Sequence, residues 1–169
     1  MVGIAASGTT PFTLAALRHA KQLGGKTGAI VNNINTSMAK LADIAVEIAS
    51  GSEIIAGSTR LSAGTTEKIA LNILSSAVMI RLGKTYGPFM VDMLASNAKL
   101  RQRAVKMVAT ITAVSEEVAL ASLQACNMHV KLAILTLQTG ITAELAQARL
   151  QAAEGSLRRA LAGFFDPID

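Results

Sequence analysis

The chain has 169 residues, of which 51% are apolar, 16% are charged and only 3% are aromatic. This length and hydrophobicity predict one folded domain, or one domain with an appendage, and exclude a disordered chain. The net charge of +5 suits an anionic ligand. The basic residues are scattered, however, and no aromatic residues stand among the densest group, at 99–106, to stack nucleic-acid bases. We therefore interpret that group as a solvated helix face and expect no nucleic-acid partner.

The cysteine and histidine content bears on compartment and metal binding. Cys126 is the single cysteine, so there is no disulfide framework and no cysteine-based metal site. Neither His19 nor His129 has a carboxylate at metal-ligand spacing, so we expect no metal. The first residues lack a basic region, and no apolar run reaches about 18 residues. We expect no membrane partner and a cytoplasmic location.

The first fifty residues alternate between short apolar runs and helical patterns. Strands are predicted over residues 2–6, 27–31 and 44–49, and helices over 11–22 and 37–42. Thr10 and Pro11 stand where an N-cap and a first-turn proline belong. This β-α-β-α-β order predicts a parallel sheet with right-handed crossovers. Its first strand would then lie beside a missing neighbour or at an exposed edge.

The pattern changes after residue 50. A loop rich in Gly, Ser and Thr leads into a long helix predicted over residues 65–82, which is apolar nearly all round and should be deeply buried. A break at 83–88 is followed by helices only, over 96–110, from 115, over 130–137, from 142 and over 156–161. The sequence therefore predicts an α/β fold. A partial parallel sheet of about three strands with flanking helices occupies residues 1–90, and an all-helical subdomain occupies residues 91–169.

Three hydroxyl-rich turns follow the predicted strands, at residues 7–10, 32–36 and 53–65. Ligands of open α/β sheets bind at the carboxyl ends of the strands, so we expect these turns to converge. Backbone N–H groups at a helix N-terminus, with Ser and Thr hydroxyls, suit a phosphate dianion. In the first turn Gly8 would let the backbone approach the ligand while Ser7 and Thr10 donate. An ordinary helix cap is the alternative.

The third turn carries the charged candidates. Arg60 could clamp an anion with two hydrogen bonds, or it could be a surface charge. Lys68 could orient a phosphate or pair with a neighbour. Glu53 is the sole carboxylate of the loop, and it could act as a general acid or base. The alternative for Glu53 is a loop-fixing carboxylate that accepts backbone N–H hydrogen bonds.

Several stretches together resemble a known family: GIAASGTTP, LADIAVEI, SEIIAGSTRLSAGTTEK, LNILSSAVMIRLGK, MVDMLASNAKLRQRA and RRALAG. They are similar to the C-terminal half of the N-acetylmuramic acid 6-phosphate etherase family, which belongs to the sugar isomerase (SIS) superfamily. The glucokinase regulatory protein is a relative. The resemblance covers nearly all of the chain. It implies a SIS domain, usually in a homodimer, and a lyase that needs no metal or other cofactor. That lyase cleaves a lactyl ether to give N-acetylglucosamine 6-phosphate and D-lactate during recycling of cell-wall sugars.

The resemblance also implies which residues bind the sugar phosphate. The family motifs fall on Ser7, Gly8, Thr10, Asn33, Glu53, Gly57, Ser58, Thr59, Arg60, Gly64, Thr65 and Lys68. The family usually has arginine at Thr9, lysine at Ser62, proline at Ser52 and serine at Val31, so two basic side chains near the ligand are replaced here.

The two catalytic glutamates of the family belong to its N-terminal half, which the resemblance does not cover. We assign no catalytic residue and expect the chain alone not to catalyse the etherase reaction. The leading hypothesis is a partial etherase that binds a phosphorylated amino sugar. The alternatives are a non-catalytic sugar-phosphate-binding regulatory module and a helical interaction protein. The strand edge and the apolar helix predict association, either as a homo-oligomer or with a complementary N-terminal half.

Overall fold

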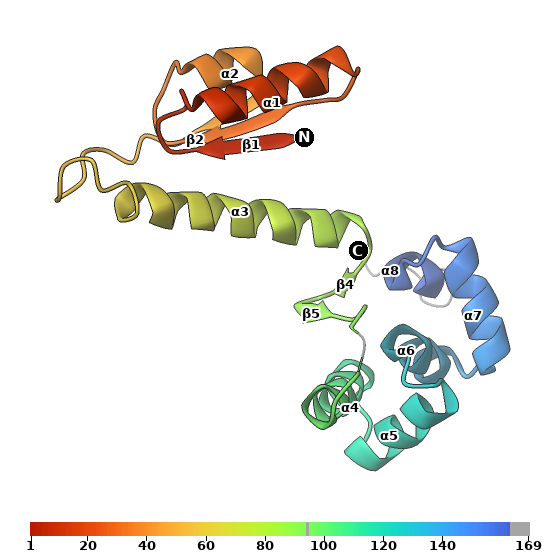
Figure 1. Cartoon of the computed structure of the whole chain (residues 1–169). Helices are drawn as coiled ribbons and strands as arrows, with labels where there is room; N and C mark the ends of the chain where they lie inside the picture. Colours follow the sequence, from red (N-terminus) through yellow and green to blue (C-terminus); the bar gives the residue numbers. More distant parts are fainter. Residues whose placement is uncertain (94, 163–169) are drawn as a thin grey trace. The chain divides into compact units, whose positions relative to one another are not determined.

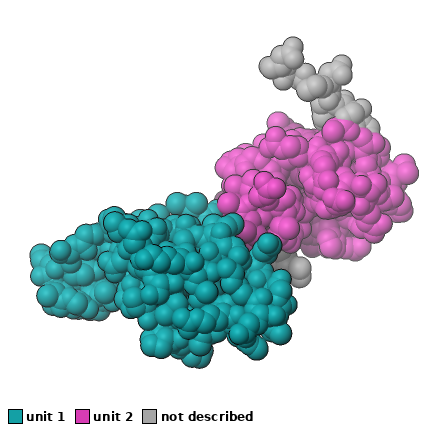
Figure 2. Space-filling view, turned by 90° about the horizontal axis from the view of Figure 1, so that it is seen from above, with its two compact units in different colours: residues 1–76 teal, residues 77–169 magenta. Residues whose placement is uncertain are grey.

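The computed structural model describes residues 1–93 and 95–162, and it divides into two compact units, residues 1–76 and 77–169 (Figures 1 and 2). The described part of unit 1 contains one parallel sheet, and that of unit 2 is mainly helical. The predicted fold class, a partial parallel sheet with a helical C-terminal part, is confirmed. The units divide within a helix, before the boundary expected near residue 90.

Unit 1 begins with two β-α units and a third strand. These are β1 (Val2–Ala5), α1 (Pro11–Gln22), β2 (Gly28–Val31), α2 (Ser37–Leu41) and β3 (Ile44–Glu47). The strands are parallel in the order β1-β2-β3, with Ile4 opposite Ile30 and Ile30 opposite Val46. Both helices lie on the same side of the sheet (Figure 1). All five elements agree with the predicted ones to within two residues at each end.

The two faces of this sheet differ in composition and in cover. Because side chains alternate along a strand, small residues such as Ala29 share one face. There they pack with Leu14, Leu17 and Met38 of the helices. The opposite face carries β-branched residues, of which Ile30 is buried. The rest stay exposed, at 49% for Val2, 40% for Ile4, 73% for Ile44 and 45% for Val46. Parallel sheets are normally covered on both faces, so this open sheet face lacks its cover.

The helix α3 (Ser62–Arg81) contradicts the expected burial. Of its residues only Ala63 is buried, and apolar side chains remain in solvent all along it, including Ile73 at 65% and Ile80 at 62%. The sequence pattern correctly identified a helix that is apolar on every side. The prediction of deep burial was wrong for this chain, because the described residues do not supply enough surface to surround such a helix.

Unit 2 contains a short antiparallel hairpin and five helices among its described residues. The hairpin joins β4 (Thr85–Tyr86) to β5 (Phe89–Met90), where only a helix break was expected. Two-residue strands are too short to produce an alternating pattern. The helices are α4 (Ala98–Thr112), α5 (Glu116–Ala125), α6 (Val130–Thr139), α7 (Ala143–Ala152) and α8 (Leu157–Leu161).

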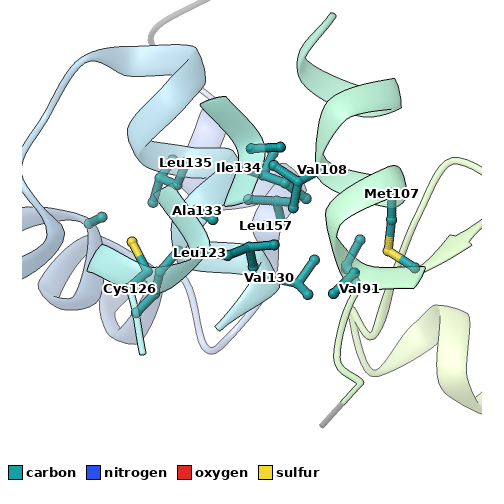
Figure 3. Packing of buried hydrophobic residues seen from close by; sticks show 14 of the residues in the cluster. Val91, Met107, Val108, Leu123, Cys126, Val130, Ala133, Ile134, Leu135 and Leu157 are labelled. Atoms are coloured by element: carbon teal, nitrogen blue, oxygen red, sulfur yellow. The ribbon is translucent and has the colours of Figure 1, made fainter. Parts of the chain in front are cut away.

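The helices of unit 2 surround α6. Its first six residues, 130–135, are all buried, and they pack with side chains of α4, α5 and α8 such as Val108, Leu123 and Leu157 (Figure 3). Ser115, Thr142 and Ser156 cap three of these helices through side-chain hydrogen bonds. In the described part, no single helix is long and apolar enough to cross a membrane. The pair α5 and α6 passes that test jointly on length and composition, although the two are bent by 113°.

Candidate functional site at the carboxyl edge of the sheet

The first turn continues directly from β1. The Gly8 N–H donates to the Ala5 carbonyl over 3.0 Å, and Gly8 has a φ of 66°. A Cβ atom at Gly8 would lie 2.5 Å from side-chain atoms of Thr36 in the second turn. The Met38 N–H also donates to the Gly8 carbonyl over 3.0 Å. Glycine is therefore required both by its backbone conformation and by the close approach of the two turns.

The hydroxyls of the first turn surround the N-terminus of α1. The Ser7 Oγ accepts hydrogen bonds from the Thr9 N–H over 3.3 Å and from the Thr9 hydroxyl over 3.2 Å. Thr10 is the N-cap, as predicted, but its side chain makes no capping hydrogen bond. Pro11 follows, and the first turn of α1 contains no acidic residue. The N–H groups of this turn thus keep the partial positive charge that attracts an anion.

The second turn is fastened to the first and to β3. The Asn33 Nδ2 donates to the Ala6 carbonyl over 3.3 Å. The Asn35 N–H donates to the carboxylate of Glu47 at the end of β3. The Thr36 Oγ1 accepts from the Ala39 N–H over 3.1 Å and so caps α2. The first two predicted turns therefore do converge at the carboxyl edge of the sheet.

A buried amide that the sequence analysis missed joins the second turn to α3. Asn32 is 5% exposed, and its Nδ2 donates to the Thr66 hydroxyl over 2.8 Å and to the Ala63 carbonyl over 3.3 Å. Its Oδ1 accepts no hydrogen bond from the described residues although it is buried. A buried acceptor is costly to leave unpaired. The available signal was an amide directly after an apolar strand, where a buried polar side chain needs hydrogen-bond partners.

Glu53 fixes the start of α3. Its Oε2 accepts from the Ser62 N–H over 2.8 Å and its Oε1 accepts from the Ala63 N–H over 2.9 Å. These two backbone hydrogen bonds, the stronger from Ala63, lower the pKa of the Glu53 carboxyl below its ordinary value. This is the loop-fixing role that the sequence analysis gave as the alternative. An ionised carboxylate held in this way is a poor proton donor at neutral pH.

The remaining predicted residues lie in the tight turn before α3 and in its first two turns. The Ser58 N–H donates to the Ile55 carbonyl and the Leu61 N–H donates to the Ser58 carbonyl. The side chains of Thr59, Arg60 and Lys68 are exposed, and in the described part none of them makes a hydrogen bond or ion pair. The Thr65 hydroxyl instead donates to the Leu61 carbonyl over 2.7 Å. Arg60 of this loop and Lys68 of α3 are thus free cations.

The arrangement suits recognition of an anion better than proton transfer. Turn hydroxyls, an uncapped helix N-terminus and two exposed cations are present, while Glu47 and Glu53 already accept backbone hydrogen bonds. Among residues 1–93 and 95–162, no three His, Cys, Asp or Glu residues lie close enough together to hold a metal ion.

The sequence of the chain is similar to that of known proteins. Residues 1–77 match the SIS domain family model. The chain is 47% identical over 161 residues to the N-acetylmuramic acid 6-phosphate etherase of Geobacillus thermodenitrificans, covering 95% of this chain and 55% of that protein. It is 50% identical over 141 residues to the etherase of Symbiobacterium thermophilum, covering 83% of this chain and 47% of that protein.

A third relative, N-acetylmuramic acid 6-phosphate etherase 2 of Vibrio parahaemolyticus, is 47% identical over 161 residues, covering 95% of this chain and 54% of that protein. The chain is thus a homologue of these etherases, and it spans about half the length of the curated relatives it matches. The expected resemblance is confirmed, and the coverage fits the C-terminal half of the family.

Proposed function

We propose that this chain is the sugar-phosphate-binding half of an N-acetylmuramic acid 6-phosphate etherase, and that its ligand is a phosphorylated amino sugar. The relatives of that name are 42–50% identical to it. The lone Cys126 thiol is free and buried, which fits a reducing compartment such as the cytoplasm.

The single observation that carries the proposal is the uncapped N-terminus of α1 at the carboxyl edge of the sheet. The Thr10 side chain makes no capping hydrogen bond, so its hydroxyl and the helix N–H groups are free to contact a phosphate. Arg60 of the third turn and Lys68 of α3 add positive charge.

The topology of the sheet supports a complementary segment beside β1. The strands lie side by side in the order of the chain, β1-β2-β3, so the strand order does not reverse within this sheet. The helices α1 and α2 lie on one side of the sheet (Figure 1). Binding crevices of open α/β sheets form where the strand order reverses. In this sheet a reversal requires a further strand beside β1, next to the turn at residues 7–10. The same segment, or a second copy of the chain, would cover the open sheet face and α3.

The chain by itself should bind without catalysing the reaction. Two of the carboxylates near the three turns, Glu47 and Glu53, already accept backbone hydrogen bonds. Ether cleavage by elimination needs a general base and a general acid, and in this proposal the complementary segment provides them. The same observation favours the second candidate function, a regulatory module that binds the sugar phosphate.

Calorimetric titration with N-acetylmuramic acid 6-phosphate tests the binding proposal. We expect saturable binding that Thr10→Val weakens about tenfold, the usual cost of losing a hydrogen bond to a charged group. Thr110→Val is the matched control, since Thr110 lies on α4 and its hydroxyl donates to the Lys106 carbonyl. The absence of binding heat, or equal loss in both variants, would contradict the proposal.

A D-lactate assay separates the two candidate functions. The chain alone should release no D-lactate. If the partial etherase is correct, adding the separately expressed N-terminal half of a relative should restore release. A regulatory module would bind the sugar phosphate and yield no D-lactate in either case, and release by the chain alone would contradict both.

A further inference from the structure

Unit 2 contains a cavity that the proposed function does not use. Its volume is about 670 Å³, within the range of small-molecule pockets. The chain around β5 forms one wall through Val91, Asp92 and Met93. The turn between α5 and α6 and the first turn of α6 form another, and Gln147 and Leu150 of α7 contribute further lining. The site lies wholly within this unit.

The charged groups of the cavity are mostly positive. Lys84, Arg101 and Lys131 line it, together with a single carboxylate, Asp92. The Lys131 ammonium lies 2.8 Å from Asp92 Oδ1, and the Lys84 ammonium pairs with Asp92 Oδ2. Burial alone would raise the pKa of the Asp92 carboxyl. The hydrogen bonds and the positive charges of Lys131 and Lys84 outweigh burial, so the pKa of Asp92 lies below its ordinary value. Both carboxylate oxygens of Asp92 are therefore paired with lysines. Since the lining contains three cationic side chains and one carboxylate, it keeps an excess of positive charge.

Two groups of the lining are available to an anion. Arg101 makes one long hydrogen bond in the described part, from its Nε to the Ala95 carbonyl over 3.4 Å, which leaves most of its donors free. Residues 130–132 form the first turn of α6, and its N-cap, His129, makes no side-chain capping hydrogen bond. Residues of that turn line the cavity, and the His129 side chain does not cap its N–H groups. Val91, Met93, Met128 and Leu150 supply apolar surface beside these groups.

We propose that this cavity binds a small organic phosphate, whose phosphate contacts Arg101 and the first turn of α6 while its apolar body contacts Met93, Met128 and Leu150. Lys131 is the positioning residue of this site. Lys131 is 8% exposed. Its ammonium pairs with Asp92 and donates to the Gly155 carbonyl over 2.8 Å. These contacts join α6 to the chain after β5 and to the loop that contains Gly155.

The test is an NMR titration of the whole chain with phenyl phosphate, which combines a phosphate with an apolar ring. We expect saturable shifts of the amides of Arg101 and residues 130–132. Arg101→Gln should raise the dissociation constant of phenyl phosphate about tenfold. Arg103→Gln should change it less than about twofold, since Arg103 is an exposed arginine of the same helix outside the cavity. Lys131→Met is avoided because it would remove the buried Lys131 ammonium from its ion pair with Asp92 and so destabilise the fold.

Three outcomes would overturn the inference. They are unsaturated or absent shifts at the cavity, equal losses in the two arginine variants, and equally tight binding of benzyl alcohol, which lacks the phosphate. Shifts confined to residues 7–10 and 32–36 would also overturn it while supporting the sugar-phosphate site of unit 1. Chemical-shift changes at the residues that line the cavity, without changes in unit 1, would support the inference independently of the sugar-phosphate site.

Discussion

The two units differ in how completely they bury their own apolar residues. The described core of unit 2 contains seventeen buried residues around α6, whereas the described core of unit 1 contains five, all between the sheet and the two helices α1 and α2. Unit 1 nevertheless has abundant apolar residues, which lie on the open sheet face and on α3. The difference shows that a sequence with enough hydrophobicity for a core can still leave many of its apolar side chains exposed in the described structure.

The largest expected effect comes from replacing isoleucine by alanine at a buried position of unit 2, compared with the same replacement at an exposed position of α3. Ile134 is fully buried in unit 2, while Ile73 on α3 is 65% exposed. Ile134→Ala should lower the free energy of unfolding by about 2–5 kcal/mol, because it removes buried methyl groups and leaves a cavity. Ile73→Ala should change it by less than about 0.5 kcal/mol. Urea denaturation followed by circular dichroism measures both values, and equal losses would show that α3 is enclosed within the chain.

The second prediction concerns self-association. Exposed apolar patches of this kind favour association, so light scattering should detect oligomers at micromolar concentration. The double variant Ile44→Lys, Ile73→Lys should lower the average mass, because it places charges on the open sheet face and on α3. Phe12→Lys is the control, since Phe12 is 83% exposed on α1, outside both surfaces. A stable monomer of the unmodified chain would contradict this prediction.

A smaller effect distinguishes the two threonine N-caps of unit 1. The Thr36 side chain accepts a hydrogen bond from the Ala39 N–H, whereas the Thr10 side chain accepts none. Thr36→Val should therefore cost about 1 kcal/mol of stability. Thr10→Val should cost almost nothing while weakening the binding of sugar phosphate. Thermal unfolding of both variants checks the pair, and a larger loss at Thr10 would show that its hydroxyl is a structural cap.

The last prediction is a pH dependence within unit 1. The pKa of Asp43 is lowered from 3.8 to about 2, first by the backbone hydrogen bond from Thr27 and then by hydrogen bonds from Lys21 and the Thr27 hydroxyl. Since the folded state favours the ionised form, this stabilisation is complete above pH 3.8 and disappears as the pH falls through about 2. Asp43→Asn should thus destabilise the chain at pH 6 but hardly at pH 2. Urea denaturation at both pH values measures this, and a difference independent of pH would contradict it.

Much of the fold could be predicted because local signals and final structure agree. The strands 2–5, 28–31 and 44–47 follow from apolar runs between turn residues, and most helix ends follow from caps such as Ser115 and Thr142. The exposure of α3 could not be predicted, because an apolar pattern indicates that a helix needs cover and does not say which chain provides it. The hairpin at residues 85–90 was missed because two-residue strands carry no periodic signal.

The candidate site was predicted in part. The turns containing Gly8 and Thr36 converge as expected from parallel strands, and the sequence analysis named Gly8 for its freedom to approach a ligand. In the structure the close approach of Gly8 is to Thr36. The role of Asn32 depends on contacts with residues more than thirty positions away, which no local pattern encodes. Whether Ser58, Arg60 and Lys68 contact a sugar phosphate stays a prediction.

Amide hydrogen exchange of the whole chain, measured residue by residue in dilute solution, tests the contrast between the units most directly. If α3 and β3 lack cover, their amides should exchange at least about a hundredfold faster than those of α6, because little buried surface opposes local opening. Exchange in α3 as slow as in α6, in a chain shown to be monomeric, would contradict the account.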